Sequence, residues 1–141
     1  FTSLPEVSDS KLGVTGGDLA AITAAFRPQV DALLINDLMF RNTPARLESI
    51  DSYPLQEFND YLRIHPNDKD ILSSTLSLFD PLAFSGAIKA DTLITCVQSQ
   101  QEDAQELADS IPGQTMVQVR SGYGYLDRQF EEQWLARSLR T

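Results

Sequence analysis

The apolar positions of this chain form short runs that are separated by segments with helical periodicity. Four runs rich in Val, Ile, Leu or Thr are apolar on both faces, which is typical of strands in a parallel sheet covered by helices. The predicted strands are Lys11–Thr15, Val30–Ile35, Thr92–Val97 and Thr115–Arg120. Helical patterns predict helices at Asp18–Ala25, Ser99–Ser110 and Leu126–Leu139. This order of elements predicts an α/β fold with about four mostly parallel strands flanked by helices.

Two of these helices carry an apolar stripe that predicts which side faces the sheet. In the first helix, Leu19, Ile22 and Phe26 fall on one side at helical spacing. Asp18 precedes them and is positioned to cap the amino end of that helix. The buried stripe predicted for the last helix consists of Phe130, Trp134 and Leu135.

The residues between the second and third predicted strands, at about 43–88, have the pattern of a helical insert. Within this insert, helices are predicted at Tyr53–Ile64 and Ile71–Phe79, and Asp80-Pro81 ends the second. We interpret their apolar residues as packing the insert onto the sheet like a lid. Residues 1–141 are therefore predicted to form one domain that contains this insert.

Composition excludes several classes of function. The formal net charge of −9 argues against nucleic acid or an anionic membrane as a partner, because both require a basic face. A single cysteine, Cys96, excludes an internal disulfide and fits a reducing compartment. The sequence has no apolar run of about 18 to 20 residues and no phosphate-binding loop, so we expect a soluble, cytoplasmic protein without a cofactor.

Two stretches carry a resemblance to a known family. Leu4–Gly17 contains Lys-Leu-Gly-Val-Thr-Gly-Gly, and Tyr53–Thr95 contains Tyr-Leu-Arg, His-Pro, Thr-Leu-Ser and Phe-Asp. They resemble the C-terminal half of the acetyl xylan esterase and cephalosporin-C deacetylase family of serine esterases, which belong to the α/β-hydrolase superfamily. The resemblance implies a partial α/β-hydrolase-like fold, homo-oligomers, and deacetylation of short acyl esters on sugars and related molecules.

The family's catalytic serine has no counterpart here. In the family the strand leads directly into Gly-Gly-Ser-Gln-Gly-Gly, whereas Gly16 and Gly17 are followed by Asp18, as though about four residues were deleted. Thr15 is a weak nucleophile candidate, because Gly13–Gly17 formally fits Gly-x-Thr-x-Gly. A β-branched residue suits the strained turn poorly, and the matching residue of the family lies inside the strand.

The triad acid and histidine of the family are also unmatched. The family's Gly-x-x-Asp loop is missing, because the third strand leads through Gln98 almost directly into a helix. Gly124 and Tyr125 resemble the Tyr-Gly-His turn, with Tyr125 where the histidine would be. A phenol with a pKa of about 10 is not a base near neutral pH. We therefore interpret Tyr123 and Tyr125 as aromatic packing at a Gly-rich turn.

Two further residues invite a catalytic interpretation. His65 is the only histidine, and it precedes Pro66 at the predicted end of a helix, so we interpret it as structural. No Cys and no paired acids stand at ligand spacing from it, and no metal site is expected. Cys96 lies in the middle of a predicted strand, which favours a small buried hydrophobic residue over a nucleophile.

Three functional hypotheses follow. The first is a non-catalytic α/β-hydrolase-like subunit that acts in assembly or binding. The second is a serine carboxylesterase that deacetylates sugar or small-molecule acetyl esters, with its Ser, His and Asp in segments that this sequence does not contain. The third is rebuilt chemistry on Thr15 or Tyr125. In the parent sheet Lys11–Thr15 is a central strand, so a half-fold predicts a partner, either a second copy or another polypeptide, on that edge.

Overall fold

The computed structural model describes residues 11–49, 51 and 53–140. Its centre is a four-stranded sheet in the order β1-β2-β3-β4, and every neighbouring pair is parallel. The strands are β1 (Gly13–Gly17), β2 (Ala32–Asp37), β3 (Asp91–Cys96) and β4 (Thr115–Val119). All four predicted strands are confirmed, with bounds that differ by at most two residues. The start of the family resemblance, at residues 4–10, lies outside the described residues.

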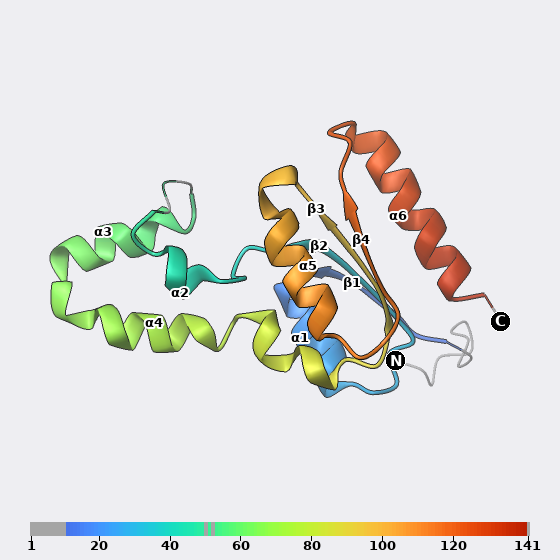
Figure 1. Ribbon diagram of the computed structural model, residues 1–141, viewed down its shortest axis with the longest axis horizontal. Helices are drawn as coiled ribbons and strands as arrows, with labels where there is room; N and C mark the ends of the chain where they lie inside the picture. Colours follow the sequence, from blue (N-terminus) through green and yellow to red (C-terminus); the bar gives the residue numbers. More distant parts are fainter. Residues whose placement is uncertain (1–10, 50, 52, 141) are drawn as a thin grey trace, which may run out of the picture.

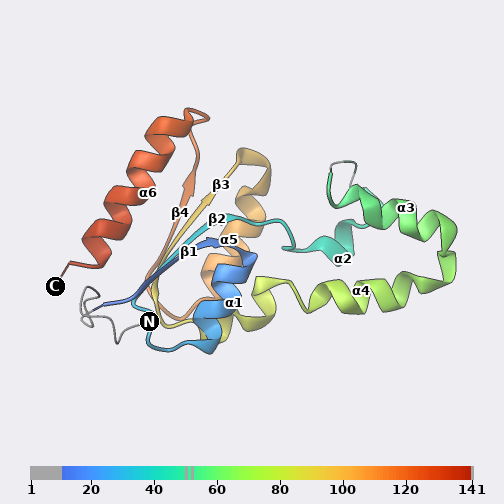
Figure 2. The same cartoon turned by 180° about the vertical axis from the view of Figure 1, so that it is seen from behind.

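Helices cover both faces of the sheet (Figures 1 and 2). On one face lie α1 (Asp18–Phe26) and α5 (Gln101–Ser110), and α6 (Gly124–Ser138) crosses the other face. The insert contains α2 (Thr43–Arg46), α3 (Gln56–Ile64) and α4 (Lys69–Ser77). Short 3-10 turns lie at Pro66–Asp68, Pro81–Ala87 and Gln98–Gln100. The predicted α/β fold, a partial α/β-hydrolase-like sheet with a helical insert, is confirmed.

The main core fills the space between the sheet and the α1–α5 layer. Leu33 and Ile35 of β2 and Ile94 of β3 point into it and are fully buried. Residues of α5, including the fully buried Leu107, pack against this core from the helix side. Burial of an aliphatic side chain of this size stabilises the fold by about 1.5 to 3 kcal/mol. Packing between the sheet and the α1–α5 layer therefore holds the strands, and with them the strand ends, in place.

The apolar stripe of α1 does not face the sheet, which corrects the sequence-based prediction. Leu19 is 74% exposed and Phe26 is 66% exposed, and the buried side of the helix consists of Ala20, Ala21 and Ala24. Small side chains allow the helix to lie close against the strands, whereas the larger residues at helical spacing are left on the outer side. Large apolar side chains on the outside of α1 are therefore available to another molecule.

The last helix is only half buried. Phe130, Trp134 and Leu135 are partly covered, as their spacing predicts, but no residue of α6 is fully buried. Glu131 accepts a hydrogen bond of 2.5 Å from the Thr95 hydroxyl of β3, which ties the helix to the sheet. Near its end the helix lies so close to β1 that a Cβ on Gly13 would be 2.9 Å from a Leu139 methyl group.

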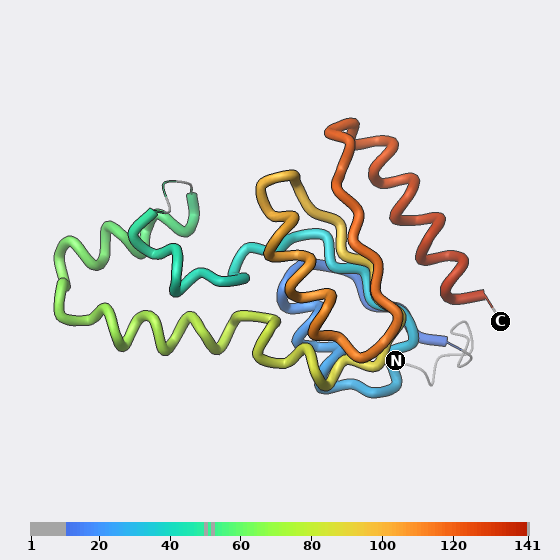
Figure 3. The backbone as a smooth tube through the Cα atoms, viewed as in Figure 1, coloured from blue at the N-terminus to red at the C-terminus, as the bar shows by residue number. Residues whose placement is uncertain are grey.

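The insert does not fold over the sheet as a lid, contrary to our interpretation of its apolar residues. Figure 3 shows that the α3–α4 pair extends away from the sheet. No residue of α3 is buried, and Leu76 is the only buried residue of α4. Ile64 and Ile71, near the far end, are 75% and 69% exposed. Leu47 and Leu76 of the insert are buried, but neither belongs to the main core.

A buried ion cluster fastens the two ends of the insert together. Arg41, which is 3% exposed, pairs with Asp80 at 3.0 Å and also with Glu106 of α5. Asp80 additionally accepts hydrogen bonds from the backbone N–H groups of Asn42 and Leu82, each at 2.9 Å. One carboxylate therefore joins Asn42, just before the insert, to Leu82, in the 3-10 turn that follows α4, and local sequence patterns did not predict this contact.

Candidate functional site at the carboxyl end of the sheet

Ligands of parallel α/β sheets bind beyond the carboxyl ends of the strands. In this protein that edge is formed by the junction of β1 with α1, the loop after β2, and the turns after β3 and β4. Each of the three catalytic positions that the resemblance implies falls on this edge, so each can be compared with the residues that stand there.

At the junction of β1 and α1, no nucleophilic side chain is presented on an exposed turn. Thr15 lies inside β1, paired in register with Leu34 of β2. Gly16 has a φ of +151°, a conformation that side chains disfavour. A Cβ on Gly17 would lie 3.0 Å from the Asp37 carbonyl oxygen, so the end of β2 approaches too closely for a side chain. The two glycines therefore lead the strand straight into α1.

Asp18 is the first residue of α1, but its side chain does not cap the helix, which corrects our prediction. Its Oδ2 instead accepts a hydrogen bond of 2.8 Å from the backbone N–H of Phe40, in the loop after β2. Asp18 is only 6% exposed, and its Oδ1 has no hydrogen-bond partner among the described residues. Half of a buried carboxylate is therefore unsatisfied.

The surroundings of Asp18 disfavour its charged form. Burial raises the pKa of Asp18 from 3.8 to about 6, and the carboxylates of Asp37 and Asp80 add to the rise. The backbone amides of Phe40 and Met39 act in the opposite direction and lower the pKa. Because desolvation is the largest of these effects, Asp18 changes its charge near the lower end of the physiological pH range.

Asp18 borders a hollow of about 370 Å³ between α1 and the loop after β2. Its lining is mostly apolar and includes Met39, Phe40 and Phe79, together with Asp37 as a second carboxylate. The rings of Phe40 and Phe79 pack at a centroid separation of 5.6 Å with their planes tilted by 38°. No basic residue belongs to the described lining of this hollow.

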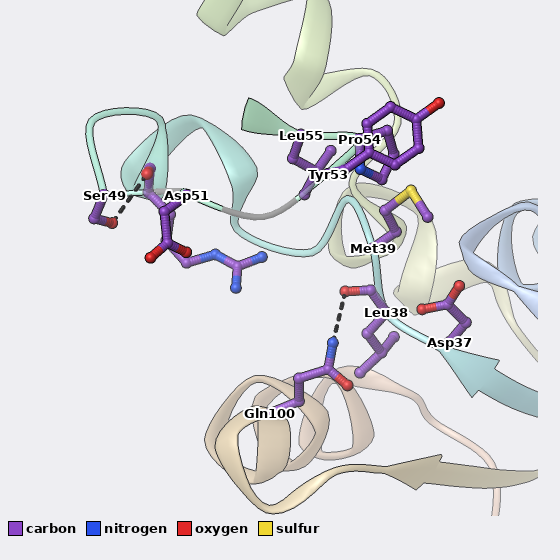
Figure 4. Close-up of a pocket in the computed structure, with 10 residues that line it drawn as sticks. Asp37, Leu38, Met39, Ser49, Asp51, Tyr53, Pro54, Leu55 and Gln100 are labelled. Carbon is purple, nitrogen blue, oxygen red and sulfur yellow. Dashed lines mark hydrogen bonds between the residues drawn. The ribbon is translucent and has the colours of Figure 1, made fainter. Parts of the chain in front are cut away.

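A second hollow, of about 320 Å³, opens between the end of β2 and the insert (Figure 4). It shares Asp37 and Met39 with the first hollow, and Tyr53 from the insert adds to its wall. Gln100 closes the side toward α5 by donating a hydrogen bond of 3.4 Å to the Leu38 carbonyl oxygen. The loop after β2 therefore contributes to two separate recesses.

The turn after β3 offers no carboxylate at the position of the triad acid. β3 ends at Cys96, and Gln98 starts a 3-10 turn in which its amide donates to Gln101 Oε1 at 2.6 Å. Glu102 and Asp103 lie in the first turn of α5, where negative charge is favourable. Asp103 approaches Arg46 at 4.0 Å.

The turn after β4 places Gly124 and Tyr125 at the start of α6. Tyr123 is 71% exposed and Tyr125 is 77% exposed, so our interpretation of these rings as packing at the turn is wrong. The turn is held instead by Asp127, which accepts hydrogen bonds of 2.8 Å from both the N–H and the hydroxyl of Ser121. These bonds lower the pKa of Asp127, and the Asp127–Ser121 contact was not anticipated from the sequence.

Neither His65 nor Cys96 completes a catalytic set. His65 lies at the end of α3, in the part of the insert that extends from the sheet, with its ring 4.7 Å from that of Tyr61. Cys96 is 1% exposed, and burial raises the pKa of its thiol, which keeps it protonated. Among the described residues no group of His, Cys, Asp or Glu is arranged to hold a metal ion. No helix in the described part of the chain could span a membrane.

The fold and the strand order are those of a partial α/β-hydrolase-like fold. Solved structures of two esterases are similar in fold: acetyl xylan esterase 1 from Thermoanaerobacterium sp. JW/SL YS485 and an acetyl xylan esterase from Paenibacillus sp. R4. The TM-scores are 0.69 and 0.68, each with 21% sequence identity. The alignments cover 94% and 93% of this chain but 48% of each esterase, so the chain spans about half their length.

Sequence comparison adds no closer relative. No protein-family model matches the chain, and no curated protein matches it. The likeness to the esterases therefore establishes the fold, and the activity has to be argued from the residues of the site.

Proposed function

We propose that this chain is a non-catalytic, acetyl xylan esterase-like subunit that acts by assembly or binding. The observation that carries the proposal is the junction of β1 and α1, where Gly17 leads directly into the buried Asp18 and no serine is presented. The only histidine lies in the insert, away from the sheet edge where a triad base would act. Acyl transfer by a serine esterase requires the nucleophilic serine and the histidine base to lie within hydrogen-bond distance of each other.

Assembly is supported by the open edge of the sheet. Among the described residues β1 pairs with β2 alone, and the backbone groups of an unpaired strand edge are normally covered in soluble proteins. Beside it, α1 turns Leu19 and Phe26 outward. We propose that a second copy of this chain covers β1 and the outer side of α1. Two-fold pairing of β1 with its copy would join the two sheets, and an obligate interface of this kind buries roughly 2,000 Å² or more.

A charged residue on the edge strand is expected to prevent this association. Thr15 is an exposed residue of β1, and a lysine there would place a charge in the interface without altering the core. We expect light scattering to give the wild type at least twice the 15.7 kDa chain mass, and Thr15→Lys the mass of one chain.

The matched control is Gln118→Lys, which adds the same charge to an exposed position of the other edge strand, β4. This variant is expected to associate like the wild type. A monomeric wild type, or an equal loss of association in both variants, would contradict the proposed role of the β1 edge.

A serine carboxylesterase remains the second candidate, because both similar solved structures are acetyl xylan esterases. In that case a serine, an acid and a histidine would have to come from polypeptide beyond these 141 residues. Hydrolysis of an activated acetyl ester separates the two candidates when it is assayed with that additional polypeptide present, because these 141 residues alone are expected to be inactive in both cases.

A further inference from the structure

The last strand, β4, forms the second open edge of the sheet. Among the described residues it pairs with β3 alone. The N–H of Arg120 donates to the Cys96 carbonyl oxygen at 2.8 Å, so in this parallel ladder the even-numbered residues of β4 bond to β3. The backbone N–H and C=O groups of Thr115 and Val117 therefore point away from β3, toward the open side of the sheet.

β4 lacks the features that usually protect an edge strand. Its sequence, Thr-Met-Val-Gln-Val, contains no charged residue and no proline, and no bulge interrupts its register with β3. The side-chain amide of Gln118, an exposed residue, donates a hydrogen bond of 2.8 Å to the Val119 carbonyl oxygen and so occupies one group of the edge. An edge of this kind is a template on which an extended peptide can add a further strand.

Two hollows lie between β4 and α6, which runs back beside the strand in the opposite direction (Figures 1 and 2). The two valines of β4 pack against the main core, so the residues that alternate with them, Met116 and Gln118, face the side of α6. Met116 and Trp134 line the first hollow, of about 430 Å³. Gln118 and Phe130 line the second, of about 230 Å³. Both hollows therefore lie along the open edge.

The spacing of the hollows suits an extended peptide. Met116 and Gln118 are two residues apart in the strand, a distance of about 7 Å. A peptide strand added to β4 would present every second side chain to the same face of the sheet, at this same spacing. Alternate side chains of the peptide would therefore enter the two hollows, while its backbone pairs with β4.

The charges beside the hollows favour a basic peptide. Asp91, at the start of β3, is an exposed residue in the lining of the first hollow, and its carboxylate has no partner among the described residues. In the second hollow Arg120 lies 3.9 Å from Glu131 and also acts electrostatically on Asp127, so its charge is balanced. The net charge of −9 attracts a cationic peptide to the molecule as a whole.

We propose that β4 and α6 bind an extended basic peptide, which adds a strand to the β4 edge. An aliphatic side chain of the peptide enters the hollow between Met116 and Trp134, and a neighbouring lysine or arginine pairs with Asp91. This site lies at the opposite edge of the sheet from β1, and it does not depend on the self-association proposed there.

The fluorescence of Trp134 reports binding directly, because it is the only tryptophan and is half-buried in the first hollow. The probe is the acetylated and amidated peptide Lys-Thr-Leu-Thr-Leu-Thr-Lys, which has no aromatic residue and reads the same in both directions. We expect a saturable change of tryptophan emission at pH 7.5 and low salt, with a Kd below about 100 μM. No saturable change up to about 1 mM would overturn the proposal.

The charge preference has its own control. The peptide Glu-Thr-Leu-Thr-Leu-Thr-Glu has the same apolar pattern and the opposite charge, and we expect it to bind at least about tenfold more weakly. Asp91→Asn should weaken binding of the lysine peptide several-fold. Equal affinity of the two peptides, or unchanged affinity of the lysine peptide in Asp91→Asn, would contradict the proposed recognition of a basic peptide.

N-methylation distinguishes strand pairing from side-chain docking. One derivative of the lysine peptide carries N-methyl groups on its threonines, and another carries them on its leucines. In an added strand only alternate N–H groups face β4, so one of the two derivatives should bind at least about tenfold more weakly than the other. Equal affinities of the two derivatives would overturn the pairing of the peptide with β4.

Two lysine variants locate the site. Gln118→Lys adds a positive charge to β4 beside the second hollow, and we expect at least about tenfold weaker binding of the lysine peptide. The matched control, Thr15→Lys, changes the other edge strand and should bind the peptide like the wild type. Because Thr15→Lys is also the variant expected to lose self-association, failure of one proposal is distinguishable from failure of the other.

Two outcomes in these variants would overturn the site. Unchanged peptide affinity in Gln118→Lys would show that the peptide binds elsewhere. A lower mass of Gln118→Lys than of the wild type in light scattering would show that a second copy of the chain, and not a peptide, covers β4.

Discussion

Replacing Asp80 by alanine is expected to lower the free energy of unfolding by about 3 kcal/mol, measured by urea denaturation at pH 7. The substitution removes the 3.0 Å ion pair to Arg41, whose side chain is 3% exposed, and leaves only the exposed Glu106 as a carboxylate partner. It also removes the acceptor for the N–H groups of Asn42, just before the insert, and Leu82, in the 3-10 turn after α4. A buried guanidinium that loses a partner retains the full penalty of desolvation.

The control is Asp60→Ala, which breaks the surface ion pair of Asp60 with Arg63 at 2.7 Å. Both partners are more than half exposed, and pairs of this kind contribute between about 0 and 1 kcal/mol. If Asp80→Ala were no more destabilising than Asp60→Ala, the buried cluster would not be what fastens the insert.

Replacing Asp18 by asparagine is expected to have the opposite effect and to stabilise the protein by about 2 kcal/mol at pH 7.5. Burial raises the pKa of Asp18 in the folded state from 3.8 to about 6, so the folded protein favours the protonated carboxyl group. The associated stability is fully present below pH 3.8 and is lost as the pH rises through about 6. Asparagine is neutral at every pH and keeps an acceptor for Phe40, so it avoids this loss.

The stabilisation should therefore shrink toward zero between pH 7.5 and pH 4, and unfolding of both proteins across this range measures it. Comparing each variant with the wild type at the same pH cancels the titration of the other carboxylates. Asp91→Asn, which neutralises an exposed carboxylate, controls for the change in net charge. Destabilisation by Asp18→Asn at pH 7.5 would mean that the ionised group is satisfied in the folded protein.

The strands were predictable because short runs that are apolar on both faces are compatible with few structures other than a covered sheet. Leu33, Ile35 and Ile94 belong to segments that are apolar on both faces, and only a covered sheet buries them. The facing side of α1 was not predictable in the same way. Leu19 and Phe26 satisfy a 3.6-residue period, but so do the alanines on the other side, and the close approach of the helix to the sheet decides between them.

In the candidate site too, local sequence patterns predicted the helix but not the contacts that its residues make with distant parts of the chain. The sequence marks Asp18 as the residue that begins a helix, and local rules then assign it to a cap. Its actual partner is the Phe40 amide, 22 residues further along the chain, and only the tertiary fold brings the two together. Phe79 joins the same hollow from the segment that follows α4, where the insert returns to the sheet, and no periodic pattern encodes this contact.

The central proposal, that these 141 residues act without an esterase site of their own, is tested most directly by the hydrolysis of p-nitrophenyl acetate. The purified chain is assayed alone and after treatment with a serine-directed organophosphonate, and covalent labelling is followed by intact mass. We predict no turnover above the uncatalysed rate and no adduct, because no serine is presented at the end of β1 and the only histidine lies in the insert. Turnover accompanied by one stoichiometric adduct would contradict this account and would identify a nucleophile.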